Sequence, residues 1–148
     1  MMKPALTLTE QERLCFMQAL NAVAWAASWD KKQPGERWLK SLSQIGNLLA
    51  VPAADWEFRA RPDDIVEKVN QIGNPRARLY FLRIIHDIHR SEWMHLMDST
   101  FFSDQHNACN IRFQNVYNPL RATIRVGADD WMTSQQIAAL CAAIGGDA

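Results

Sequence analysis

The sequence has few of the features that mark membrane, secreted or nucleic-acid-binding proteins. No apolar run approaches the roughly 18–20 residues that a membrane-spanning helix needs, and the N-terminal stretch MMKPALTLTEQER lacks the hydrophobic core of a signal peptide. Cys15, Cys109 and Cys141 form no CxxC pair, so we expect reduced, mostly buried thiols. Sixteen Lys and Arg balance sixteen Asp and Glu, which gives no general attraction for nucleic acid or an anionic membrane. We therefore expect a cytoplasmic protein without a membrane partner.

Motifs of catalysis are also missing from the sequence. It has only six glycines, none of them in a phosphate-cradling pattern, and it contains no GxSxG motif. No pair of acid and base residues has a recognisable catalytic spacing. These observations favour a protein that is not an enzyme, and they predict no cofactor.

The residues that are present indicate a globular helical protein. A chain of 148 residues with 48% hydrophobic and 22% charged residues is expected to form one domain, residues 1–148, with a real core. Thr9-Glu10-Gln11-Glu12 matches a capping box, in which Thr9 and Glu12 bond to each other's backbone, and predicts a helix from there to about Ala27. Apolar residues at helical spacing predict further helices over about 36–50, from 62 to about 72, over 76–97 and over 133–144. Residues 52–61 are expected to be a connection that docks through Trp56 and Phe58.

Residues 98–131 leave two structures open. Ser103 is a candidate N-cap for a helix that Asn118-Pro119 would end. After it, residues 120–126 alternate apolar and polar, the period of a strand, and could pair with residues 111–113 as a short β-hairpin near 110–126. We favour a further helix because everything upstream is helical. The fold class predicted is therefore mainly α, a compact single-domain bundle of six or seven helices, with the hairpin as the alternative.

The densest group of metal-ligand side chains is HDIHRSEWMH, residues 86–95. His86 and His89 are spaced i, i+3 on one predicted helix, and His89 with Glu92 repeats that spacing, as a zinc site would require. Steps of three rotate by about 60° each, so His86 and His95 end on opposite sides of the helix and cannot share one ion. A third ligand such as His106 or Asp30 would be needed. The favoured interpretation is that His86 and His89 are hydrogen-bonded core or edge histidines, with a divalent-metal site as the alternative.

Two groups of residues are candidates for binding a partner. Trp29, Trp56 and Trp131 occur among polar residues, where an exposed indole can anchor another protein. Arg121 and Arg125, with Arg112 nearby, could form a basic strip for an anion, a carboxylate-rich partner or nucleic acid. A solvated face is the simpler interpretation of these arginines.

Over residues 9–93 the layout resembles the TerB-like family, compact helical proteins named for tellurite resistance. The resemblance is carried by TEQERLCFMQALNAVAWA followed by SWDKKQPGERWLKSLSQIGNLLAV, and by the helix pair in DDIVEKVNQIGNPRARLYFLRIIHDI. It implies a helical fold, a stress-related role and divalent-metal binding through acidic residues, which here would be Asp30, Glu36, Asp87 and Glu92. Lys31 stands where the family has glycine after the first aspartate.

The sequence as a whole predicts a non-catalytic, cytoplasmic protein-interaction module, an adaptor, regulator or neutralising partner of another protein, which could also form a homo-oligomer. A metal-binding helical enzyme or sensor that uses His86 and His89 is the first alternative. A weak nucleic-acid or anion binder that uses Arg112, Arg121 and Arg125 is the second.

Overall fold

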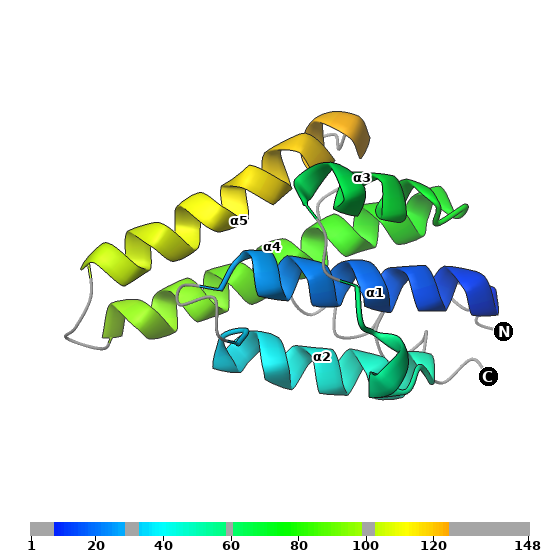
Figure 1. Ribbon diagram of the computed structural model, residues 1–148, viewed down its shortest axis with the longest axis horizontal. Coiled ribbons are helices and arrows are strands. Elements are labelled where there is room, and N and C mark those ends of the chain that lie inside the picture. Colours follow the sequence, from blue (N-terminus) through cyan, green and yellow to red (C-terminus); the bar gives the residue numbers. More distant parts are fainter. Residues whose placement is uncertain (1–7, 29–32, 59–60, 99–102, 125–148) are drawn as a thin grey trace, which may run out of the picture.

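The computed structural model describes residues 8–28, 33–58, 61–98 and 103–124, which form five α-helices and one short 3-10 turn. In chain order these are α1 (Glu10–Ala26), α2 (Glu36–Leu49), η1 (Ala53–Asp55), α3 (Pro62–Asn70), α4 (Pro75–Asp98) and α5 (Ser103–Ile124). In Figure 1, α2 lies on one side of α1, and α3 and α5 lie on the other. The mainly α-helical fold class is confirmed for these residues.

The start of α1 is the predicted capping box. The Glu12 backbone N–H donates to Thr9 Oγ1 at 3.1 Å, and the Thr9 N–H donates to Glu12 Oε1 at 3.0 Å. The second oxygen of Glu12 accepts the backbone N–H of Asn74 at 2.7 Å. Asn74 in turn caps α4, because its Oδ1 accepts the N–H of Arg76 at 2.9 Å. One carboxylate therefore joins the beginning of α1 to the beginning of α4.

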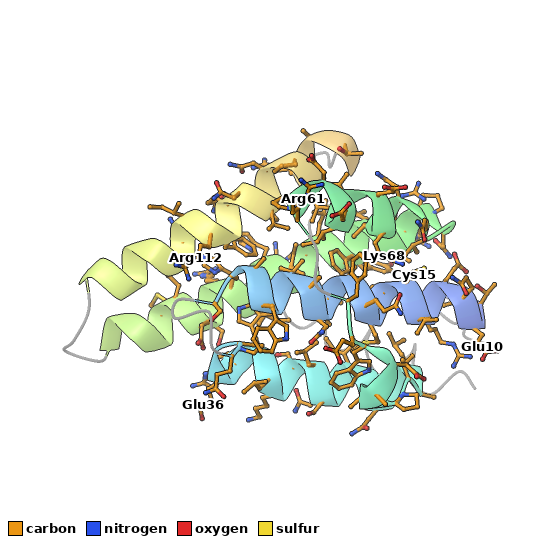
Figure 2. All side chains as sticks on the ribbon, viewed as in Figure 1. Glu10, Cys15, Glu36, Arg61, Lys68 and Arg112 are labelled. Atoms are coloured by element: carbon orange, nitrogen blue, oxygen red, sulfur yellow. The ribbon has the colours of Figure 1, made fainter. Side chains whose placement is uncertain are left out.

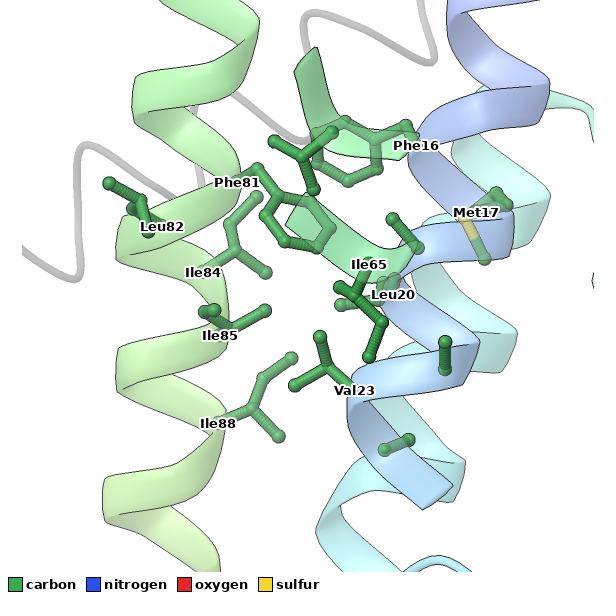
Figure 3. Close-up of a cluster of buried hydrophobic side chains, with 14 of the residues drawn as sticks. Phe16, Met17, Leu20, Val23, Ile65, Phe81, Leu82, Ile84, Ile85 and Ile88 are labelled. Atoms are coloured by element: carbon green, nitrogen blue, oxygen red, sulfur yellow. The ribbon is translucent and has the colours of Figure 1, made fainter. Parts of the chain in front are cut away.

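The core lies around α1, which contacts each of the other four helices. Phe16 and Phe81 meet edge to face with ring centroids 5.2 Å apart, an arrangement that aromatic pairs prefer. Burial of each such ring contributes about 1.5–3 kcal/mol. Figure 3 shows this part of the core between α1 and α4, with side chains from α3 closing it. Its labelled members are Phe16, Met17, Leu20, Val23, Ile65, Phe81, Leu82, Ile84, Ile85 and Ile88.

The connection between α1 and α2 is held by side chains from α4 and α5. The N-cap of α2 is Gly35, which has no side chain to offer, and the buried carboxylate of Glu92 takes its place: Glu92 Oε2 accepts the backbone N–H of Arg37 at 3.2 Å. A carboxylate there also complements the positive end of the helix dipole. From α5, Arg112 Nη1 donates to the carbonyl of Ser28 (Figure 2).

The segment that follows α2 is held against α1 by hydrogen bonds. Polar side chains of α1 reach its carbonyls: Asn21 Nδ2 donates to Trp56 O at 3.1 Å, and Gln18 Nε2 donates to Asp55 O at 3.3 Å. Trp56 and Phe58 are partly buried against the core. The docking of this connection through Trp56 and Phe58 is therefore confirmed, with Ala53–Asp55 forming the 3-10 turn.

The structure of residues 103–124 differs from the prediction for this part of the chain. They form one continuous helix, so Asn118-Pro119 does not end a helix, and no strand or hairpin occurs among the described part of residues 110–126. Between positions 110 and 123, the buried residues of α5 lie on one helical face: Phe113, Val116, Tyr117 and Leu120 are at most 4% exposed. The free energy gained by burying these side chains outweighs the loss of the backbone hydrogen bond that Pro119 cannot donate. The Thr123 hydroxyl donates to the Pro119 carbonyl at 2.8 Å.

The number of helices is consequently smaller than predicted. The described ranges hold five α-helices rather than six or seven: residues 103–124 form one element instead of two, and the described residues end at 124. The helix expected over residues 133–144 lies outside the described residues.

Candidate functional site

A polar groove lies between α4 and α5. Its volume is about 520 Å³, within the range of small-ligand sites. Its lining residues are all polar or aromatic: Arg83, His86, Gln114, Tyr117, Asn118 and Arg121. We call it the α4–α5 groove.

Helical spacing brings these six side chains together. Arg83 and His86 are three apart on α4, whereas positions 114, 117, 118 and 121 follow the i, i+3, i+4, i+7 pattern on α5. Residues with that spacing share one face of a helix. The two faces meet because α4 and α5 pack against each other.

Ring contacts fix the position of Tyr117, one of the residues that line the groove. The His89 ring lies parallel to Phe113 at 3.9 Å, Phe113 stacks on Tyr117 at 5.1 Å, and His86 lies 5.7 Å from Tyr117 at a tilt of 42°. Tyr117 itself is only 4% exposed. These contacts with Phe113 and His86 hold the Tyr117 ring in place at the groove.

The electrostatics of the groove are dominated by cations. Burial raises the pKa of Tyr117 above its ordinary value of 10.0, and the charges of Arg121 and Arg83 oppose that rise. Arg83, Arg121 and Tyr117 all line the groove. Asp87 offsets part of this charge, since its Oδ1 lies 3.2 Å from Arg83 Nε and 3.6 Å from His86 Nδ1.

The residues predicted to hold a metal take different positions. His86 faces the groove, whereas His89 is buried, with Nε2 3.1 Å from Asn110 Oδ1. Glu92 accepts from the start of α2, and Glu36 is exposed there (Figure 2). Asp30 lies outside the described residues, as do the side chains of His95 and His106. Within the described ranges, no three His, Cys, Asp or Glu side chains gather as ligands for one ion.

The residues predicted to bind a partner are also separated. Arg121 lines the α4–α5 groove, and Arg112 donates to Ser28 O. Trp56 is half-buried, and its indole N–H donates to Val51 O at 2.9 Å, so its ring fastens the segment after α2. Trp29, Trp131 and Arg125 lie outside the described residues.

A second groove, of about 500 Å³, lies where the start of α1 meets the segment after α2. Its polar lining includes Glu10, Arg13, Asp55 and Glu57. Arg13 Nη1 donates to the Leu49 carbonyl at 3.0 Å and so caps the end of α2. None of the residues predicted as ligands or partner contacts lies there.

Four lining residues of the α4–α5 groove were not predicted from the sequence, namely Arg83, Gln114, Tyr117 and Asn118. The i, i+3, i+4, i+7 spacing over residues 114–121 would have indicated the α5 wall. A helix that ends at Asn118-Pro119, as the sequence predicts, separates Arg121 from the other three residues and hides this pattern.

Comparison with known proteins gives no further assignment. No protein-family model matches the chain, and neither curated proteins nor solved structures give a match. In the part of the chain that the structure describes, no helix combines the length and apolarity needed to cross a bilayer.

Proposed function

We propose that the protein is a non-catalytic interaction module of the cytoplasm, and that it contacts its partner through the α4–α5 groove. The observation that carries this proposal is the convergence of Arg83 and Arg121, from two different helices, on one open polar groove. Arginine is enriched where proteins bind one another, because its planar, rigid group makes several hydrogen bonds at once.

The rest of the molecule supports a rigid binding surface. Ring contacts with Phe113 and His86 hold Tyr117 at the groove, and α4 and α5 each pack on α1. Binding residues on packed helices lose little conformational freedom when a partner binds. The stress-related role and the divalent-metal site that the TerB-like resemblance implies stay predictions.

Site-specific cross-linking in cells tests the proposal. A photoreactive amino acid replaces Asn118 in the groove or, as the matched control, the exposed Gln44 on α2. We expect a discrete cross-linked protein species from position 118 and not from position 44, and we expect Arg121→Glu to abolish it. Equal cross-linking at both positions, or none at position 118, would contradict the proposal.

A further inference from the structure

We draw no further inference here: the strongest candidate, the groove between the start of α1 and the segment after α2, is marked only by a cluster of exposed carboxylates, those of Glu10, Asp55 and Glu57, and no second observation in the part of the chain that the structure describes points to a ligand there.

Discussion

At the scale of single residues, two glycines mark places where another side chain approaches the backbone of α2. A Cβ on Gly35 would lie 1.7 Å from Glu92 Oε1, and a Cβ on Gly46 would lie 2.2 Å from Cζ2 of Trp56. Neither distance is compatible with an ordinary contact. Glycine at these positions lets Glu92 reach the start of α2 and lets Trp56 pack against its last turn, which no sequence period reveals.

Gly35→Ala should therefore destabilise the protein. The new methyl group displaces the Glu92 carboxylate from the start of α2, and loss of that cap costs about 1–2 kcal/mol. The free energy of unfolding in urea measures the effect. Gly73→Ala is the matched control, since its Cβ would meet only Glu12 Oε2 at 3.4 Å, and it should stay within about 0.5 kcal/mol of wild type. Similar values for both variants would show that the contact of Gly35 with Glu92 does not matter.

The carboxylate of Glu12 should make stability depend on pH. The backbone N–H of Thr9, with a smaller contribution from that of Asn74, holds the pKa of Glu12 below its ordinary value of 4.5, against the opposing effect of partial burial. A carboxyl whose pKa is lowered by folding stabilises the folded state above the unfolded pKa and loses that effect as the pH falls through the folded pKa.

Glu12→Gln should accordingly lower the free energy of unfolding at pH 7 by about 1 kcal/mol, the typical value of a helix-cap interaction. The difference between the variant and wild type should shrink as the pH falls below about 4.5, the ordinary value for the group. Urea unfolding of both proteins at pH 7 and at pH 3 measures it. A difference that is the same at both pH values would show that the charge of Glu12 is not what stabilises the fold.

At the scale of elements, α5 shows how tertiary burial overrides a local signal. Proline inside a helix removes one hydrogen bond and favours a break, and the alternation after it favours a strand. Both signals are local, whereas the packing of Phe113, Val116 and Leu120 against the bundle depends on residues far away in the chain. The starts of α1 and α3 were predictable because their capping residues and first-turn proline act locally.

Pro119→Ala should raise the stability of the protein. Alanine restores an N–H inside α5 and is about 3 kcal/mol more favourable than proline in a helix interior, from which the greater entropy of the unfolded chain subtracts up to about 1 kcal/mol. We expect a net gain of about 2 kcal/mol, seen as a higher thermal midpoint. Asn115→Ala, at an exposed position of the same helix, should change the midpoint only slightly. A lower midpoint for Pro119→Ala would show that the proline ring is needed for packing.

At the scale of the whole molecule, the sequence predicted the helical architecture better than the site. Periodic apolar residues indicated which helix faces are buried, and they predicted the ranges of α1, α2 and α4. The groove depends instead on which faces of α4 and α5 pack against each other, and this packing cannot be predicted from a single sequence. Arg121 was predicted as a contact residue, but Arg83, 38 positions earlier, could be joined to it only by the fold.

The hydrogen bonds that hold the α1–α2 connection affect how the bundle unfolds. Ser28 and Arg37, on either side of that connection, bond to side chains of α5 and α4 respectively. If α2 alone dissociated from the bundle, the hydrogen bond between the backbone N–H of Arg37 and the carboxylate of Glu92 would break at once. That intermediate would have a high free energy. The helices should thus melt together in one cooperative transition, with hydrogen exchange of α2 and α4 reporting the same opening free energy.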